Sequence, residues 1–141
     1  MNGESDRSES VLEVLSEEQC RELIASRDVG RIAFSIEDQP EVFPVNYAVD
    51  GSVVVFRTGE DTKLMQALVS RVAFEVDSWD PDRGIAWSVV LKGVAQEVTA
   101  GIDPFSAALR ERPVFPLAPG VRERWIAVYP SEMTGRRFKL S

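Results

Sequence analysis

The chain has 141 residues and a formal net charge of −7, with 44% hydrophobic and 28% charged residues. That length fits one domain with a substantial hydrophobic core. Histidine is absent, which excludes Ser-His-Asp catalysis and histidine-ligated zinc or haem. The single cysteine, Cys20, excludes an intramolecular disulfide or a four-cysteine metal site. The acidic balance argues against a protein that binds nucleic acid.

Neither a membrane span nor a secretion signal is visible. No apolar run approaches the roughly 20 residues that a membrane-spanning helix needs. The polar segment 1–10 lacks the apolar stretch of a signal peptide and is typical of a flexible tail, which leaves a single domain at 11–141. We therefore expect a cytoplasmic protein whose partners include neither nucleic acid nor a membrane.

The first predicted element is a helix. Residues 16–19 (SEEQ) form a capping box with Ser16 as N-cap, and apolar residues follow at helical spacing until 29–30. Cys20 lies on the apolar face of this helix, so we expect an inert core residue. Alternating apolar residues at 30–36 then predict a strand.

A hairpin follows a turn at 37–40. The strands at 42–49 and 52–57 flank Asp50-Gly51. Asp-Gly between alternating apolar runs favours a type I′ turn, because glycine readily adopts the positive φ that the turn requires.

The second half of the chain is also rich in strands. Its predicted elements are a helix at 62–69, a strand at 71–77, a loop at 78–84, a strand at 85–99, a short helix at 103–110, a Pro-rich connector at 113–120 and a last strand pair at 122–129 and 132–140. The helix carries an apolar face of Leu64, Met65, Leu68 and Val69. Gly93 predicts a bulge or bend in its long strand. Six or seven strands with short helices favour an antiparallel barrel.

The segment 56–63 (FRTGEDTK) is the strongest candidate for chemistry. A phosphate could be held here by a guanidinium, two hydroxyls and an ammonium, contributed by Arg57, Thr58, Thr62 and Lys63, beside the N–H groups of a helix start. The alternative is that Asp61 or Thr62 only caps the helix and both cations are solvated.

Several segments together resemble the pyridoxamine 5′-phosphate oxidase-like family, the flavin-binding split barrels. They are LSEEQCRELI at 15–24, VGRIAFS at 29–35, FPVNYAVDG at 43–51, VVFRTGEDTKL at 54–64, VAFEVDS at 72–78, WSVVLKGVAQEV at 87–98 and TGRRF at 134–138. The resemblance implies a mainly β fold, a six-stranded antiparallel split β-barrel with short peripheral helices. It also implies a homodimer that holds flavin mononucleotide (FMN) at the subunit interface.

The resemblance also implies a set of cofactor-binding positions. They are the strand residues Val45, Asn46 and Tyr47, the phosphate turn Arg57, Thr58, Thr62 and Lys63, the pair Trp87 and Ser88, and, near the C-terminus, Trp125 and Arg136. No catalytic residue and no metal ligand is implied.

Alternative roles remain open for several of these residues. The Asn46 amide, polar in an apolar strand, can be satisfied by a ligand or by backbone. Trp87 and Trp125 fit packing or subunit contacts as well as stacking on a ring. Arg136 and Arg137 point to opposite faces of a strand, so at most one points inward.

Departures from the vitamin-B6 oxidases argue against oxidation of pyridoxamine phosphate. Those enzymes have basic residues on the second strand, where this chain has FPVNYAV, and a C-terminal arginine–histidine motif, where it has GRRFKLS. The resemblance is closer to the nitroimidazole-resistance-like branch. We expect an FMN-binding oxidoreductase of unknown substrate, without haem or metal. One alternative is a reductase that uses the deazaflavin F420, for which the basic residues after position 110 could hold the longer tail. The other is a non-catalytic flavin-binding or dimeric interaction module.

Overall fold

The computed structural model describes residues 11–59, 62–99 and 124–140. The elements in chain order are β1 (Val11–Val14), α2 (Glu17–Ala25), β2 (Val29–Ile36), β3 (Gln39–Asp50), β4 (Val53–Thr58), α3 (Lys63–Gln66), β5 (Arg71–Asp80), β6 (Ile85–Glu97) and β7 (Arg124–Lys139). The predicted tail at 1–10, helix at 103–110 and connector at 113–120 lie outside the described residues. Neither described helix is long and apolar enough to cross a membrane.

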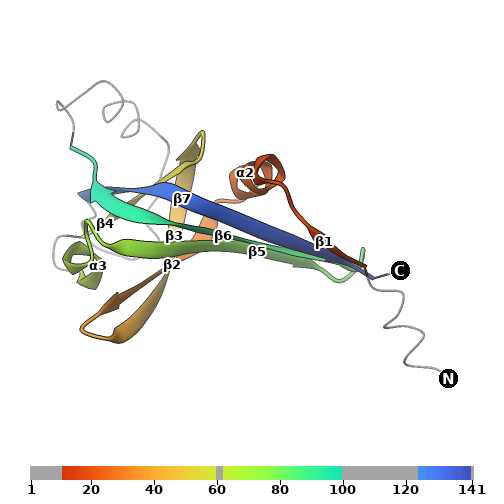
Figure 1. Ribbon diagram of the computed structural model, residues 1–141, viewed down its shortest axis with the longest axis horizontal. Coiled ribbons are helices and arrows are strands. Elements are labelled where there is room, and N and C mark those ends of the chain that lie inside the picture. The colour runs from red at the N-terminus through yellow and green to blue at the C-terminus, as the bar shows by residue number, and fades with distance from the viewer. Residues whose placement is uncertain (1–10, 60–61, 100–123, 141) are drawn as a thin grey trace.

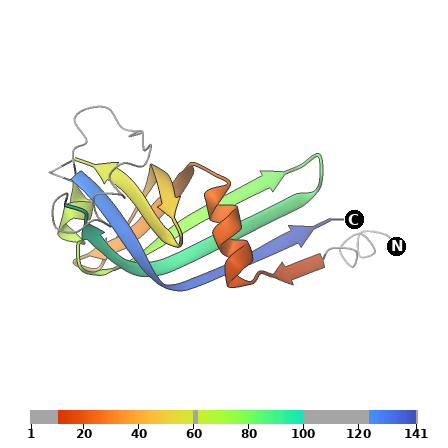
Figure 2. The same cartoon turned by 90° about the horizontal axis from the view of Figure 1, so that it is seen from above.

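Six strands close into an antiparallel barrel, and the seventh pairs with one of its long strands. The order is β7-β4-β3-β2-β5-β6, and β6 pairs with β7 again, which closes the ring. β1 lies along the far end of β7, where Val14 pairs with Arg136. Figures 1 and 2 show the barrel at one end of the molecule and β5, β6 and β7 running out from it. The predicted split barrel with short peripheral helices is confirmed, whereas β1 was not predicted.

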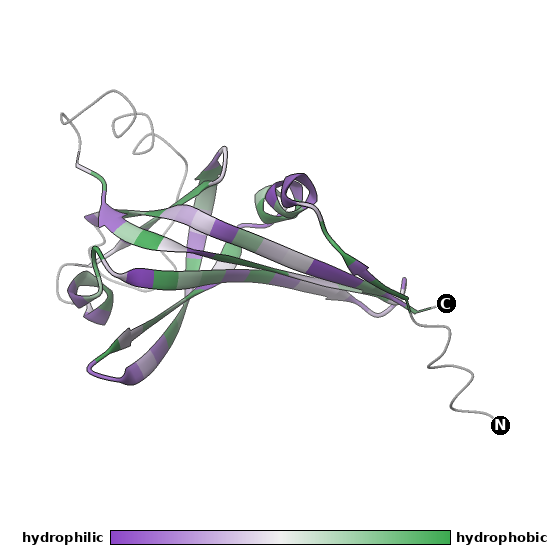
Figure 3. Ribbon diagram, in the orientation of Figure 1, coloured by the Kyte–Doolittle hydropathy of each residue, from purple (hydrophilic) through white to green (hydrophobic). Residues whose placement is uncertain are grey.

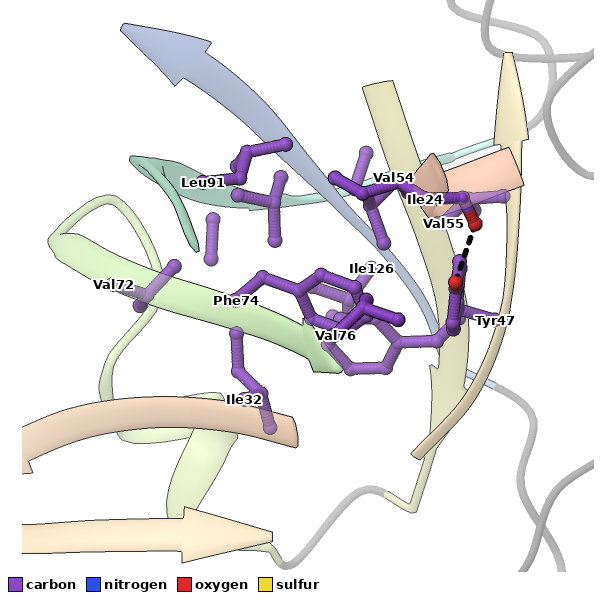
Figure 4. Close-up of a cluster of buried hydrophobic side chains, with 14 of the residues drawn as sticks. Ile24, Ile32, Tyr47, Val54, Val55, Val72, Phe74, Val76, Leu91 and Ile126 are labelled. Atoms are coloured by element: carbon purple, nitrogen blue, oxygen red, sulfur yellow. Dashed lines mark hydrogen bonds between the residues drawn. The ribbon is translucent and has the colours of Figure 1, made fainter. Parts of the chain in front are cut away.

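The barrel core is built by side chains that face inward from different strands. Phe56, Phe74 and Ile126 come from β4, β5 and β7 and have no exposed surface. The Tyr47 ring meets Phe74 edge-on, with centroids 4.9 Å apart. Its hydroxyl donates a hydrogen bond to the Ile24 carbonyl of α2, as Figure 4 shows. This bond attaches the helix to the barrel.

Beyond the barrel, four strands continue as an extension that we call the ribbon (residues 11–14, 77–80, 85–88 and 136–139). These segments pair side by side, so residues 79, 86, 138 and 12 form one row across the four strands, each beside the next. One face of the ribbon exposes four large apolar side chains: Leu12 at 55%, Val14 at 82%, Trp79 at 57% and Phe138 at 43%. The hydropathy colouring in Figure 3 shows green segments along these strands out to their tips. The ribbon therefore exposes apolar surface that the barrel would bury.

α2 lies against the long strands where the ribbon leaves the barrel (Figure 2). Its predicted capping box is confirmed, because Gln19 N donates to Ser16 Oγ at 3.1 Å and Ser16 N donates to the Gln19 side chain at 2.8 Å. The helix ends at Ala25, before the predicted end at 29–30. Cys20 is fully buried, as expected, and a Cβ on Gly135 would come within 2.7 Å of its sulfur. The close approach of helix and strand thus depends on glycine.

The predicted bulge at Gly93 is confirmed. The register of β6 on β7 shifts between Lys92 and Gly93, and Gly93 pairs with Pro130. Ser131 is the extra residue on β7. A Cβ on Gly93 would lie 2.0 Å from the Tyr129 carbonyl oxygen, so only glycine fits here.

The predicted last strand pair is wrong. Residues 124–129 and 132–139 do not form a hairpin around Pro130-Ser131, because both belong to the single strand β7. Proline has no N–H to donate to a ladder, but a bulge tolerates it. The chain therefore passes through 130–131 without turning back.

The other tight connections differ in detail from the prediction. Asp50 pairs with Val53, so the turn is Gly51-Ser52, and only Gly51 (φ 63°) has a positive φ. That is the type II′ pattern, not the predicted type I′. Type I′ angles occur instead at Glu37 and Asp38, with φ of 50° and 66°. The predicted loop at 78–84 is also wrong in part, because β5 continues through Asp80.

The second helix is shorter than predicted. α3 has four residues, against the predicted 62–69, although Leu64 is buried as expected. Val69 is 77% exposed and has φ 65°. Since a left-handed residue cannot continue a right-handed helix, Val69 does not belong to the predicted apolar face.

Candidate functional site

The turn after β4 brings two predicted hydroxyls together. Thr58 is buried, and its Oγ1 lies 3.1 Å from Thr62 Oγ1. The Thr62 hydroxyl donates to the Gly59 carbonyl at 3.2 Å, so it accepts from Thr58. Thr62 is the N-cap of α3 but makes no side-chain cap bond. With one turn of helix the dipole adds little, so any anion here would depend on side chains.

Lys63, the next predicted residue, forms an ion pair with Glu41 of β3. Lys63 Nζ lies 3.0 Å from Glu41 Oε2, and the side chains are 60% and 20% exposed. Lys63 thus remains exposed to solvent and has a carboxylate partner within the chain. An ammonium has three N–H donors, so two remain for another acceptor. Sequence reasoning missed Glu41, because no local pattern links positions 22 residues apart.

Asn46, Arg57 and Trp125 lie on one outward face of β3, β4 and β7. Arg57 pairs directly with Trp125, and its guanidinium carbon is 5.4 Å from the indole centroid. Tyr47 pairs with Phe56, which sets Asn46 beside Arg57 in the ladder. Asn46 is half-buried and already has an interaction inside the protein. The free-energy cost of burying an unpaired amide is therefore no argument for a ligand at Asn46.

Val45 and Tyr47 point the other way, into the barrel. Tyr47 is buried, and Val45 is half-buried against the core. Burial, and secondarily the charge of Asp28, raises the pKa of the Tyr47 phenol, although Arg27 partly opposes the shift. Tyr47 thus stays neutral and structural, and a ligand on the face of Asn46 would not touch its ring.

The remaining three predicted residues lie on the ribbon. Ser88 and Arg136 are cross-strand neighbours on one face, and Arg136 is exposed. Trp87 lies on the opposite face, where the guanidinium carbon of Arg27 stands 6.0 Å from its ring centroid. Arg137 shares that face and donates to Glu13 at 3.0 Å, which confirms that the two arginines point to opposite sides.

One chain does not bring the two groups of predicted residues together. Trp125 and Arg136 lie on the same strand, separated by about 35 Å of chain at the rise of an extended strand. The group at the β4 turn and the group on the ribbon therefore lie at opposite ends of β7. A single small ligand cannot touch both within one protomer.

A titratable cluster that sequence reasoning missed lies between these groups. Arg31 NH1 contacts Glu75 Oε1 at 3.2 Å and Asp77 Oδ2 at 3.3 Å. Desolvation, then the hydrogen bond and charge of Asp77, raises the pKa of Glu75 to about 7, against the opposing effect of Arg31. The spacing of 75 and 77 puts both carboxyls on one strand face, but nothing local signals Arg31.

Metal ligands do not gather in the described part of the chain. Among residues 11–59, 62–99 and 124–140, no three Cys, Asp or Glu side chains lie close enough together to hold an ion. The site residues are thus cations, hydroxyls, an amide and aromatic rings.

Comparison with known proteins identifies the family. The family model described as pyridoxamine 5′-phosphate oxidase matches residues 16–137. An uncharacterised protein of Mycobacterium tuberculosis is 34% identical over 129 residues, which cover 87% of this chain and 83% of that protein. The chain therefore belongs to the pyridoxamine 5′-phosphate oxidase family.

Solved structures share the fold over nearly the whole chain. The FAD binding protein of Mycobacterium smegmatis matches with a TM-score of 0.77 at 34% identity, covering 92% of this chain and 99% of that one. A candidate 5-nitroimidazole antibiotic resistance protein of Bacteroides thetaiotaomicron matches with a TM-score of 0.65 at 13% identity, covering 93% and 90%. At that identity the second match shows the fold alone.

Proposed function

We propose that this chain binds a flavin nucleotide by its phosphate at the turn after β4 and acts as an oxidoreductase. The observation that carries the proposal is the turn itself, where the Thr58 and Thr62 hydroxyls bond to each other and Lys63 follows Thr62. Hydroxyls and cations are the donors that a phosphate needs, and each hydroxyl would leave its present acceptor to donate to the phosphate. The likeness to the FAD binding protein of M. smegmatis, at 34% identity, supports a flavin in particular.

The residues of the chain fit such a group. Thr58, Thr62 and Lys63 would hold the phosphate, while Arg57, whose guanidinium lies over Trp125 on the outward face of β4, would contact another part of the nucleotide. Asn46, on the same face as Arg57, would address the ribityl chain or the ring. A bound flavin would supply hydride or electron transfer, so the protein need only bind and orient it. The family resemblance favours FMN, and the M. smegmatis relative adds FAD.

A second copy of the chain would complete the site. The ribbon carries Ser88 and Arg136 far from the turn, and its exposed apolar face includes Trp79 and Phe138. Contiguous exposed apolar surface is typical of an interface. In an antiparallel pair of protomers, the ribbon of one could cover the outward face of the other and bring these residues to the flavin.

The two alternatives, an F420-dependent reductase and a non-catalytic flavin-binding module, make different predictions. An F420-dependent reductase would need free cations along a groove, but Arg137 is paired with Glu13 and Arg124 with Glu97. A non-catalytic module would bind flavin without turnover. Since the sequence has no histidine to ligate iron, we predict no Soret band from a histidine-ligated haem.

The test is a set of titrations of the purified protein with riboflavin, FMN, FAD and F420, followed by absorbance and flavin fluorescence. We expect saturable binding of FMN or FAD at least tenfold tighter than of riboflavin, and reduction of the bound flavin by a nicotinamide donor. Lys63→Met should bring nucleotide binding down to the riboflavin level, a loss of about 2 kcal/mol. The control Lys92→Met removes a surface lysine 3.9 Å from Glu132 and should change nothing. Equal affinity for riboflavin and both nucleotides would refute the phosphate site, and tight F420 binding alone would replace flavin with deazaflavin.

A further inference from the structure

Glu41 is an unexpected member of the site. It lies near the start of β3, while Lys63 begins α3, so the ion pair joins the β2–β3 hairpin to the proposed phosphate turn. The Glu41 side chain is only 20% exposed and the Lys63 side chain 60%. Lys63 is therefore the member of the pair that a ligand can approach more easily.

We propose that Glu41 determines which flavin nucleotide the site prefers, favouring the pyrophosphate of FAD over the terminal phosphate of FMN. This inference rests on the proposed function, because it presumes that Lys63 binds the phosphate. It goes further by assigning selectivity to a carboxylate outside the predicted site.

The physical reason is the charge that the ligand presents at Lys63. A terminal phosphate monoester carries a charge of about −1.5 to −2 at pH 7, whereas each phosphate of a pyrophosphate diester carries a single negative charge. Lys63 keeps two N–H donors while it contacts Glu41, so a phosphate can bind without displacing the carboxylate. Glu41 then stays beside the anion, and the repulsion between like charges grows with the charge of the nearest phosphate.

A second cation near the turn is also paired with a carboxylate. Arg124, which pairs with Thr58 across β4 and β7, donates to Glu97 at 2.8 Å. Lys63 and Arg124 thus both have carboxylate partners, which lowers the attraction of the turn for a dianion. The exposure of Lys63 also leaves a larger nucleotide free to continue past it into solvent.

The experiment compares Glu41→Gln with the unmodified chain. The amide keeps an oxygen that can accept from Lys63 and removes only the charge. We expect the Kd for FMN to fall roughly fivefold and that for FAD roughly twofold, with riboflavin unchanged. Glu17→Gln is the matched control, since Glu17 forms a comparable ion pair with Arg21 at 3.1 Å on α2, and it should leave all three affinities unchanged.

Two outcomes would overturn the inference. The first is an unchanged ratio of FMN to FAD affinity in Glu41→Gln, and the second is an equal gain for riboflavin. Raising the salt concentration is an independent check, because screening should shrink the difference between the variant and the unmodified chain. Lys63→Met distinguishes a failure of the proposed phosphate site from a failure of the role of Glu41. If Lys63→Met still binds the nucleotides normally, the phosphate site is wrong. If Lys63→Met loses nucleotide binding but Glu41→Gln has no effect, only the role of Glu41 is wrong.

Discussion

The barrel and the ribbon are made from the same strands but have opposite surroundings. Inside the barrel, Phe56, Phe74 and Ile126 meet from three strands and have no exposed surface. On the ribbon, Trp79 and Phe138 occupy equally regular strand positions and remain 57% and 43% exposed. Alternation alone therefore does not say whether an apolar face is covered within the chain. The barrel thus buries its apolar side chains within one chain, and the proposed function assigns the cover of the ribbon to a second copy.

The largest expected effect comes from adding a side chain at Gly93, in the part of β6 that belongs to the barrel. A side chain there would strike the backbone of Tyr129, because the Cβ position is 2.0 Å from its carbonyl oxygen. Gly93→Val should lower the free energy of unfolding by at least about 3 kcal/mol, measured by urea denaturation. Gly51→Ala is the contrast, since no atom lies within 4 Å and only its φ of 63° is unfavourable; it should lose about 1 kcal/mol. Equal losses would mean that the close approach of Gly93 to Tyr129 does not restrict position 93 to glycine.

The next effect comes from Trp79 on the ribbon, where one substitution should change dimer affinity but not the stability of the monomer. Trp79→Asp should leave the unfolding of the monomer almost unchanged, because the side chain is already 57% exposed. If the ribbon is the interface, the same change should weaken a dimer roughly thirtyfold, as loss of a buried tryptophan anchor does. Sedimentation velocity at several concentrations measures it. Val69→Asp, at an exposed position off the ribbon, should not alter assembly, and a monomeric unmodified chain would refute the interface.

A smaller effect tests how α2 is attached to the barrel. Tyr47→Phe removes the hydroxyl that donates to the Ile24 carbonyl and leaves that buried acceptor unpaired. We expect the free energy of unfolding to fall by about 1.5 kcal/mol while the barrel fold is kept. Denaturation followed by far-UV circular dichroism measures the loss. An unchanged midpoint would show that packing against Phe74, not the hydrogen bond, attaches the helix.

The smallest effect concerns pH and the Glu75 cluster between the two regions. The pKa of Glu75 is raised to about 7 from an ordinary 4.5, so the folded state binds an extra proton between those values. The free energy of unfolding attributable to Glu75 should therefore fall as the pH rises from 4.5 to 7. After allowance for solvent screening the change is about 1 kcal/mol.

Glu75→Gln is the test of that pH dependence. The variant should be more stable than the unmodified chain at pH 8 and equal to it near pH 4.5, measured by thermal denaturation across the range. Glu17→Gln, in an exposed ion pair, should run parallel to the unmodified chain. A Glu75→Gln curve that is also parallel would show that Glu75 does not titrate in this window.

Much of the fold was predictable because its signals are local. The capping box at Ser16 and the hairpin around Gly51 each depend on residues within a few positions of one another. Local steric and hydrogen-bonding rules act over that range. The same rules failed for α3, because nothing in the sequence shows that Val69 turns left-handed after one turn of helix.

The sequence by itself determined the strand-rich pattern and the family, and it puts Thr58 only four positions before Thr62. Only the tertiary structure decided that Lys63 meets Glu41, that Tyr47 bonds to α2, and that Trp125 and Arg136 lie at opposite ends of one strand. Each of these depends on how strands far apart in the chain are registered around the barrel. Register is set by closure of the ring and by packing of its core. An alternating sequence pattern looks the same after a shift of two residues along the strand, so the pattern does not specify which residues pair.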